Sequence, residues 1–486
     1  MTEKILEQTS TRFMLINGEL VSADSEEWIQ VENPATGEIV GRAPKAGSND
    51  IDRAVASARR AFDSWSRETP SRRARLLYSI ADELEKQRES IAHIVASETG
   101  NAIRTQARPE VQWSVDVLRY FASGCQSCLG TTIPLGPDVF SCTVREPYGV
   151  VAAVIPWNSP LILTALKIGM ATSTGNTIVL KCAMEAPLGA LALAEICSEY
   201  MPAGVVNVLS GGGEDCGAIL IAHPGVDKVT FTGSTEVGKS VMRESAQRIV
   251  PTSLELGGKN PSIVFEDSDT DETALGVISA MRFTRQGQSC TAGSRLLVHD
   301  SIFDSFVDRV VSHLRGLKVG DPLDESTDMG SIINVRQYDR VVQFLEESAI
   351  QGGEFATGAV PPRERSHGFF VDPVVMTGID PSWRIAREEV FGPVLVALPW
   401  RSEQEAIALA NDTHYGLSAF IWTRDVSRAW RVAHSVQAGW VQINRGLGQL
   451  PGMPYGGIKE SGLGREFSMD AAIDAYTYVK SISVGI

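Results

Sequence analysis

The chain has 486 residues, of which 43% are hydrophobic and 21% are charged, and its formal net charge is −15. A chain of this length is too long for one ordinary hydrophobic core, so we expect two or more domains. The acidic charge argues against a nucleic-acid partner, which needs a basic surface, and no apolar run reaches the ~20 residues of a membrane helix.

The N-terminal part of the chain predicts a largely helical region. Its first residues, MTEKILEQTSTRF, lack the apolar stretch of a signal peptide, which indicates a cytoplasmic protein. Residues 50–122 hold long charged segments with helical periodicity and a glycine stop at Gly100. Cys125 and Cys128 form a C-x-x-C pair, but no second pair or nearby histidine completes a zinc set, so we expect no metal site. The seven cysteines, odd in number and scattered, suit reduced thiols.

The rest of the chain alternates between two kinds of segment. Short β-branched runs alternate with helical stretches from residue 145, and a second alternating stretch begins near residue 257. This pattern is typical of βαβ units, so we predict an α/β fold with two doubly wound α/β domains. Such sheets bind ligands at the carboxyl ends of their strands. Residues 140–149 and 475–486 predict strands that pair outside either domain.

Cys290 stands in a loop of small and polar residues, RQGQSCTAG, at positions 285–293. Small neighbours let a substrate approach closely, which a nucleophile needs. An unperturbed thiol has a pKa of about 8.5, so an enzyme would need a base or a dipole nearby to form the thiolate. From the loop alone, a nucleophile and an inert buried cysteine are equally good interpretations.

Two further polar residues follow predicted strands. Glu255, in TSLELGGK, ends a β-like run just before two glycines, where a carboxylate can act as general base on water or lie exposed at a strand end. Asn158, in VIPWNSP, can direct its amide at a developing oxyanion or close a turn. Neither residue decides the function by itself.

The segment FTGSTEVG places Gly233, Ser234 and Gly238 between a predicted strand and a predicted helix. Free N–H groups and a helix N-terminus would then face an anion, and a dinucleotide pyrophosphate is a natural occupant. The spacing is not G-x-G-x-x-G, so a plain helix start is the alternative.

Together with other motifs, these residues resemble the aldehyde dehydrogenase superfamily. The motifs are NPATGE (33–38), PWN (156–158), ELGGK (255–259), GQSC (287–290), EEVFGP (388–393), PYGGIKESGLGRE (454–466) and AYTYVK (475–480). They extend almost from end to end in the family's order, and this combination is far more specific than any single motif.

The resemblance implies a mechanism for the catalytic residues. Cys290 would attack the aldehyde carbonyl to give a thiohemiacetal, while Asn158 and the Cys290 N–H hold the oxyanion. Reduction of a nicotinamide cofactor leaves a thioester, which water activated by Glu255 hydrolyses to the carboxylic acid. Lys167 matches a family lysine with a supporting role. The glutamate favours hydrolysis over transfer to coenzyme A.

The resemblance also implies NAD or NADP as cofactor, with NAD slightly favoured. The residues that it assigns to cofactor binding are Ile155, Pro156, Trp157, Lys181, Met184, Gly213, Gly217, Phe231, Gly233, Ser234, Val237, Leu256, Gly257, Glu389 and Phe391. Met184 stands where the family's NAD-selecting glutamate falls, so the repulsion of a 2′-phosphate is absent and NADP is acceptable. Glu185 would take that role only if the loop shifted by one residue.

The substrate is expected to be a small-molecule aldehyde in a pocket with few aromatic rings. The residues that the resemblance assigns to this pocket are Ser159, Leu163, Leu166, Thr284, Ser289, Thr291, Gln449 and Tyr455. Several are polar where relatives have aromatic rings, which predicts a wide, polar mouth of the pocket. Without those rings the pocket lacks cation–π contacts for a trimethylammonium group, which argues against betaine aldehyde as substrate. Arg285 would meet a substrate carboxylate or form a structural pair.

The family likeness further divides the chain into domains. A Rossmann-like cofactor domain is expected at 1–124 and 148–256, a catalytic domain at 257–460, and a small β oligomerisation arm and tail at 125–147 and 461–486. Arm and tail would extend a partner's sheet, so we expect a homodimer or homotetramer. Two alternatives stay open, which are a cysteine hydrolase using one of the seven histidines and an inactive scaffold of the same fold.

Overall fold

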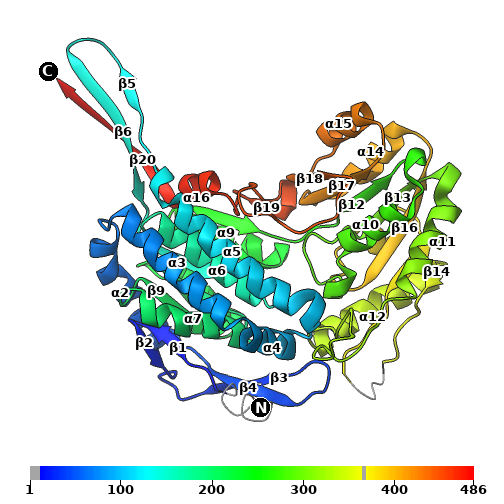
Figure 1. Ribbon diagram of the computed structural model, residues 1–486, viewed down its shortest axis with the longest axis horizontal. Helices are drawn as coiled ribbons and strands as arrows, with labels where there is room; N and C mark the ends of the chain where they lie inside the picture. Colours follow the sequence, from blue (N-terminus) through cyan, green and yellow to red (C-terminus); the bar gives the residue numbers. More distant parts are fainter. Residues whose placement is uncertain (1–10, 364–367, 486) are drawn as a thin grey trace.

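The computed structural model describes residues 11–363 and 368–485, so the predicted ends of the chain at 1–10 and 486 lie outside the described residues. These residues form two α/β lobes side by side, with a narrow β arm projecting from one of them (Figure 1). We call the lobe with the eight-stranded sheet the first lobe and the lobe with the seven-stranded sheet the second lobe. The predicted fold class is therefore confirmed.

The sheet of the first lobe has the strand order β19-β11-β10-β7-β8-β9-β1-β2. Its central strands are parallel, and the antiparallel strands lie at the two ends. The strands are β1 (Met14–Ile16), β2 (Glu19–Val21), β7 (Val150–Val154), β8 (Thr177–Cys182), β9 (Val206–Ser210), β10 (Lys228–Thr232), β11 (Thr252–Glu255) and β19 (Gly462–Leu463). β19 comes from residues that we assigned to the tail, and the predicted domain boundaries stay predictions.

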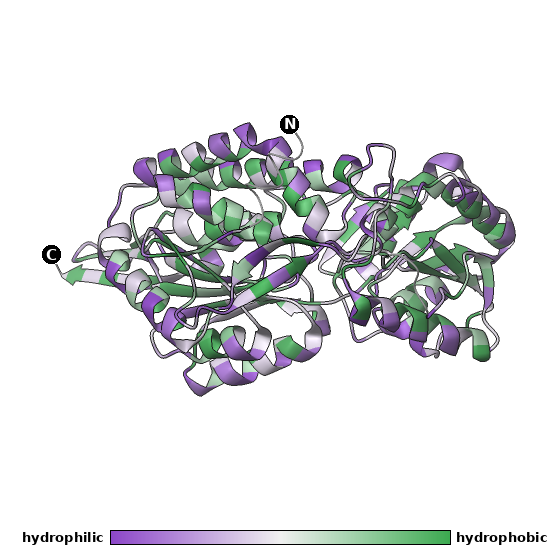
Figure 2. Cartoon of the chain, turned by 90° about the horizontal axis from the view of Figure 1, so that it is seen from below, coloured by the Kyte–Doolittle hydropathy of each residue, from purple (hydrophilic) through white to green (hydrophobic). Residues whose placement is uncertain are grey.

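Helices cover both faces of this sheet because successive side chains of each strand point to opposite sides. In β7, Val151 and Ala153 belong to one apolar cluster, whereas Val150 and Ala152 belong to another. One face is covered by α3 (Pro70–Lys86), α4 (Arg88–Thr99), α5 (Arg108–Gly124), α6 (Pro160–Ser173) and α7 (Leu188–Tyr200), and the other by α2 (Ser48–Trp65), α8 (Ile219–Ala222) and α9 (Thr235–Gln247). Figure 2 shows the apolar strands between these helical layers.

The sheet of the second lobe has the strand order β14-β15-β16-β13-β12-β17-β18, and all neighbours except β14 and β15 are parallel. Its strands are β12 (Pro261–Val264), β13 (Arg295–His299), β14 (Glu354–Thr357), β15 (Val374–Thr377), β16 (Val394–Trp400), β17 (Ser418–Trp422) and β18 (Trp440–Ile443). Its helices are α10 (Asp271–Met281), α11 (Phe303–Leu314), α12 (Val335–Ile350), α13 (Arg384–Arg387), α14 (Glu403–Asn411) and α15 (Val426–Ser435). Both predicted alternating stretches thus form parallel sheets.

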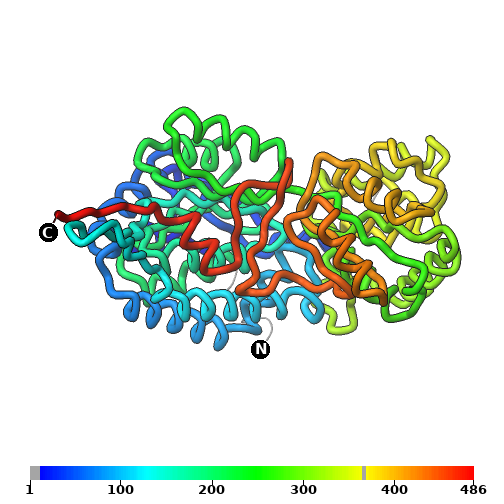
Figure 3. Tube along the Cα trace, turned by 90° about the horizontal axis from the view of Figure 1, so that it is seen from above, coloured from blue at the N-terminus to red at the C-terminus, as the bar shows by residue number. Residues whose placement is uncertain are grey.

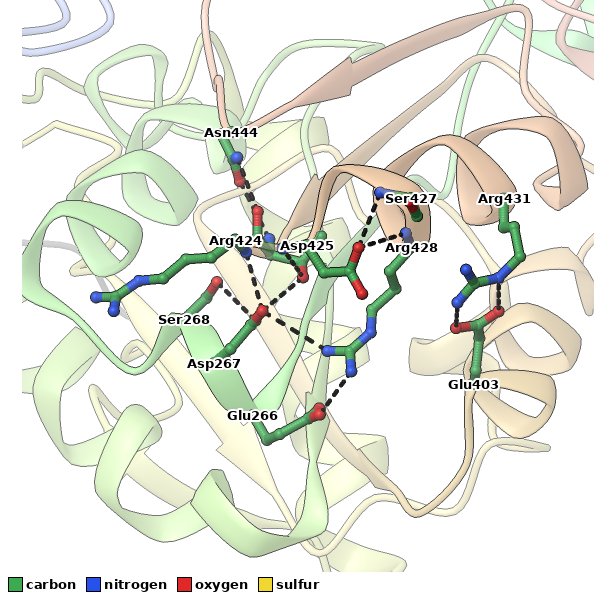
Figure 4. Close-up of polar contacts among 11 residues, drawn as sticks. Glu266, Asp267, Ser268, Glu403, Arg424, Asp425, Ser427, Arg428, Arg431 and Asn444 are labelled. Carbon is green, nitrogen blue, oxygen red and sulfur yellow. Dashed lines mark hydrogen bonds and ion pairs between the residues drawn. The ribbon is translucent and has the colours of Figure 1, made fainter.

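Polar contacts attach α15 to the outer end of the second lobe (Figure 4). Asp425 caps the helix by accepting hydrogen bonds from the N–H groups of Ser427 and Arg428 at 2.8 and 3.1 Å. The Arg428 guanidinium also lies 2.8 Å from the Glu266 carboxylate, which follows β12. An N-cap and an ion pair therefore fix the helix from both sides of its first turn.

The arm is a three-stranded antiparallel sheet of β5 (Thr132–Pro134), β6 (Val139–Pro147) and β20 (Thr477–Gly485). β20 follows α16 (Met469–Tyr476), and it pairs with β6 from Thr477 opposite Pro147 to Gly485 opposite Val139. The two segments that the sequence predicted as strands therefore pair with each other. Figure 3 shows the C-terminal segment returning from the second lobe across the first to reach this arm.

The N-terminal hairpin of β3 (Trp28–Glu32) and β4 (Ile39–Pro44) forms a separate two-stranded sheet. Within the described residues, no helix has both the length and the apolar character that crossing a bilayer takes.

The two lobes are in tight backbone contact where Gly330 meets Gly100, the left-handed residue that ends α4 with a φ of 75°. A Cβ on Gly330 would overlap the carbonyl oxygen of Gly100. Because that oxygen belongs to the backbone, no change of side-chain rotamer can relieve the overlap.

We expect Gly330→Ala to destabilise the protein by about 1–3 kcal/mol, the usual effect of overpacking a tight contact. Thermal unfolding followed by circular dichroism measures this change. Gly47→Ala is the control, because nothing lies within 4 Å of a Cβ at that position. Equal melting temperatures for the two variants would contradict the close contact.

Candidate active site

The loop that carries Cys290 lies between the 3-10 turn Phe283–Arg285 and β13, and its backbone is tightly held. Gln286 and Gly287 adopt left-handed conformations with φ of 53° and 64°. The Asn260 side chain donates hydrogen bonds to the carbonyl oxygens of Cys290 and Ala292, at 2.8 and 2.9 Å. These bonds fix the loop, so the position of the sulfur does not depend on a flexible segment.

The Cys290 thiol is half-buried, and its Sγ lies 3.4 Å from the Tyr455 hydroxyl. Burial raises the pKa of this thiol to about 11, and the contact with Tyr455 partly opposes the rise. In this arrangement only on the order of one thiol in ten thousand is ionised at neutral pH. Among the described residues, the Cys290 sulfur contacts the Tyr455 hydroxyl and forms no hydrogen bond with a histidine, so the pairing that a cysteine hydrolase needs is not seen.

Asn158 connects the first lobe to the loop that carries Cys290. It follows β7, and its Nδ2 donates a hydrogen bond to the carbonyl oxygen of Gln288 at 3.0 Å, two residues before Cys290. The next helix, α6, is capped by the buried Glu110, which accepts from the N–H of Leu161 at 3.1 Å. The amide of Asn158 is therefore directed at the catalytic loop by a fixed strand and a fixed helix start.

Glu255 ends β11 and is 4% exposed, and neither of its carboxyl oxygens has a hydrogen-bond partner among the described residues. Burial, followed by the negative charge of Glu466, raises the pKa of Glu255 well above its usual value, whereas the charge of Lys167 opposes the rise. Burial without a hydrogen-bond partner therefore favours the neutral form of the Glu255 carboxyl. It is placed to exchange a proton rather than to hold structure.

Lys167 and Glu466 form an ion pair beside Glu255, and both side chains are fully buried. Thr230 connects them, because its Oγ1 accepts from Lys167 Nζ at 2.9 Å and donates to Glu466 Oε1 at 3.1 Å. Sequence reasoning missed Glu466. Its place at the end of the motif PYGGIKESGLGRE was the available signal, but the motif alone does not say which of its residues is buried.

A cleft of about 780 Å³ opens at the carboxyl ends of the strands of the first lobe. Ten of the predicted cofactor residues line it: Ile155, Pro156, Trp157, Lys181, Met184, Gly213, Gly217, Phe231, Gly233 and Val237. A Cβ on Gly233 would lie 2.5 Å from the Phe231 ring, so this wall depends on a glycine. Ser234 caps α9 by accepting from the Val237 N–H at 3.4 Å. The size, the helix N-terminus and Lys181 fit a dinucleotide.

The other predicted cofactor residues are not among the residues that line this cleft. Phe391 has a left-handed backbone, with a φ of 60°, and its ring centroid lies 5.5 Å from that of Trp157. Glu389 accepts a hydrogen bond from the Gly258 N–H at 3.1 Å, and burial raises the pKa of its carboxyl to about 7. Leu256 and Gly257 are fixed by hydrogen bonds with Ser461.

Several of the predicted substrate residues are held by polar contacts. Arg285 contacts the Ser159 hydroxyl, and Gln106 donates to the Thr284 hydroxyl at 2.6 Å. Ser289 and Thr291 share a hydrogen bond of 3.0 Å between their hydroxyls. Leu166 is buried, and Leu163 and Gln449 are half-buried.

Arg285 takes the structural one of its two expected roles in this arrangement. Its Nη2 lies 3.4 Å from the buried Glu110 carboxylate, and its Nε donates to Gln106 at 3.1 Å. Since Glu110 caps α6, this arginine links the catalytic loop to the helix that follows Asn158.

Comparison with known proteins extends over nearly the whole chain. The family model described as "Aldehyde dehydrogenase family" matches residues 20–482. The DhaS protein of Bacillus subtilis (strain 168) is 39% identical over 479 residues, which cover 98% of this chain and 96% of DhaS.

Solved structures agree with this match. The NAD+ complex of an aldehyde dehydrogenase from Bacillus cereus is 39% identical with a TM-score of 0.96, covering 100% of this chain and 98% of that one. An NADP-dependent enzyme of E. coli is 34% identical with a TM-score of 0.95, covering 99% of both chains.

We expect the alkylation rate of Cys290 by iodoacetamide, without substrate, to rise about tenfold per pH unit between about pH 7 and pH 10, because the reactive thiolate fraction grows until pH reaches the pKa. Mass spectrometry of the Cys290 peptide measures the rate. Tyr455→Phe removes a contact that lowers the thiol pKa, so alkylation of this variant should be slower at each pH. A rate that levels off near neutral pH would contradict a raised pKa.

Proposed function

The chain belongs to the aldehyde dehydrogenase family and oxidises an aldehyde to the carboxylic acid with reduction of NAD or NADP, and we propose that Cys290, Asn158 and Glu255 carry this reaction. The observation that supports the assignment is the junction of the two lobes, where the Asn158 amide lies on the Cys290 loop.

The first chemical step belongs to Cys290 and Asn158. The sulfur, once deprotonated, forms a bond to the carbonyl carbon, and the carbonyl electron pair becomes an oxyanion. The Asn158 Nδ2 and the Cys290 N–H then donate hydrogen bonds to that oxygen, so Asn158 exchanges its contact with Gln288 for one with the substrate. When bound, the nicotinamide cofactor supplies the electron-pair acceptor for the oxidation. The protein is left with an acyl group on sulfur.

The second step belongs to Glu255. As a carboxylate it takes a proton from water, and the resulting hydroxide attacks the thioester carbon. The carbon–sulfur bond then breaks, which releases the acid and the Cys290 thiolate. Glu255 must lose its own proton first, since burial favours its neutral form. We assign Lys167 and Glu466 a positioning role, because their opposite charges shift the Glu255 pKa in opposite directions.

We propose the first lobe as the cofactor domain and the second as the catalytic domain. The cleft residues would hold the adenosine and pyrophosphate, and Glu389 and Phe391 would hold the nicotinamide half beside Trp157. The substrate would be an aldehyde with polar substituents, because hydrogen-bonded side chains of Ser159 and Thr284 occupy the places of aromatic rings. We further propose that the protein acts in the cytoplasm.

Glu255→Gln should release a single burst of reduced cofactor and then stall, because a glutamine cannot take the proton of the deacylating water. Stopped-flow absorbance of reduced nicotinamide, with aliphatic, aromatic and semialdehyde substrates and with NAD or NADP, measures burst and steady state. Glu354→Gln, on a strand remote from the cleft, is the control and should keep the wild-type steady-state rate. Full steady-state turnover by Glu255→Gln would refute the role of Glu255.

We also propose that subunits associate through the arm. β20 and β18 are edge strands of their sheets, and β20 exposes Ile482 and Val484 by 39% and 51%. Unpaired edges with apolar side chains favour pairing with another chain.

The double variant with Ile482→Asp and Val484→Asp should therefore have a lower solution mass than the wild type, since two charges would be buried in the contact. Size-exclusion chromatography with light scattering measures the mass. Ile350→Asp, which changes a residue 86% exposed on the second lobe, is the control and should keep the wild-type mass. A monomeric wild type, or an unchanged mass of the double variant, would overturn this assembly.

A further inference from the structure

Arg336 is a cation at the mouth of the dinucleotide cleft, and it is not among the residues that the sequence assigned to cofactor binding. It lies in the first turn of α12 in the second lobe, yet it lines the same cleft as Lys181 and Met184 of the first lobe. Its side chain is 82% exposed, and its guanidinium lies 3.6 Å from the Glu185 carboxylate. In Figure 1, α12 lies where the second lobe faces the first.

The charged side chains at the mouth of the cleft partly neutralise one another. Met184 is neutral and 42% exposed, and the neighbouring carboxylate of Glu185 is paired with Arg336 instead of standing alone. Lys181 is almost fully buried and donates to the Gly211 carbonyl at 3.1 Å. Glu244 of α9 is the other carboxylate that lines the cleft. The negative charge of Glu185, which would repel a 2′-phosphate, is therefore offset by an arginine.

Arginine is well suited to such a ligand. A phosphate monoester carries nearly two negative charges near neutral pH, and a guanidinium donates two parallel hydrogen bonds to its oxygens. A 3.6 Å ion pair with an exposed partner is weak, so the guanidinium can leave Glu185 at little cost. Phosphate, with its higher charge, would compete well for it.

We propose that Arg336 recognises the 2′-phosphate of NADP and that Glu185 holds the arginine at the cleft mouth until that phosphate binds. The inference rests on the proposed function, in that the cleft must hold the adenosine end of a nicotinamide cofactor. It makes Arg336 the residue by which this chain distinguishes NADP from NAD.

The test is a comparison of dissociation constants for NADP and NAD by isothermal titration calorimetry of the whole protein. Arg336→Gln should raise the ratio of the NADP constant to the NAD constant about tenfold or more, the usual effect of losing a charge-assisted hydrogen bond. Arg336→Lys keeps the positive charge but not the two parallel hydrogen-bond donors, so it should raise the ratio less than Arg336→Gln does. Glu185→Gln should lower the same ratio, because it removes the competing carboxylate.

The control is Arg363→Gln. Arg363 is also exposed and paired with a glutamate of α12, Glu346, but it does not line the cleft. It should leave both dissociation constants unchanged.

The outcomes separate this inference from the proposed function. If the wild type binds NAD but not NADP, or if Arg336→Gln weakens both equally or neither, the role of Arg336 is overturned while the cofactor site stands. If neither nucleotide binds the wild type, the proposed function fails as well. A change of ratio confined to the variants of Arg336 and Glu185 supports the inference.

Discussion

Removal of water from ionisable side chains is the constraint on which the rest of the site depends. Burial raises the pKa of the Cys290 thiol to about 11, raises that of Glu255 well above its usual value, and raises that of Glu389 to about 7. Burial thus favours the neutral forms of both the proposed nucleophile and the proposed general base, so Cys290 has to lose a proton before it attacks and Glu255 has to be ionised before it accepts one.

The Lys167–Glu466 pair provides the electrostatic setting for that release. An ion pair that is fully buried is costly to form, and its contribution to stability is small. The pair does act on the neighbouring carboxyl. The negative charge of Glu466 disfavours ionisation of Glu255, whereas the positive charge of Lys167 favours it. The pair thus acts on the base without contacting the reacting carbon.

Much of the fold could be predicted from the sequence because the central strands are buried on both faces and appear as short, continuous apolar runs. Cys290, Glu255 and Asn158 could be proposed as site residues, since each stands at a strand end or in a glycine-rich loop, and their roles stay predictions. Glu466 and its partner lie 299 residues apart, and Arg285 lies 175 residues from Glu110. Nothing local in the sequence records such pairs, so they and the pairing of Arg336 with Glu185 required the three-dimensional structure.

Contacts between the two lobes lie at the residues proposed for catalysis and cofactor binding. Asn158 of the first lobe binds the Gln288 carbonyl of the second, and the Phe391 ring meets Trp157. A separation of the lobes would take Asn158 away from the Cys290 loop, so the mechanism proposed above requires this arrangement of the lobes. The exposed end of the cleft, where Arg336 faces Glu185, is joined by a single weak ion pair. We therefore expect cofactor exchange to begin at that end, while the contacts around Cys290 stay in place.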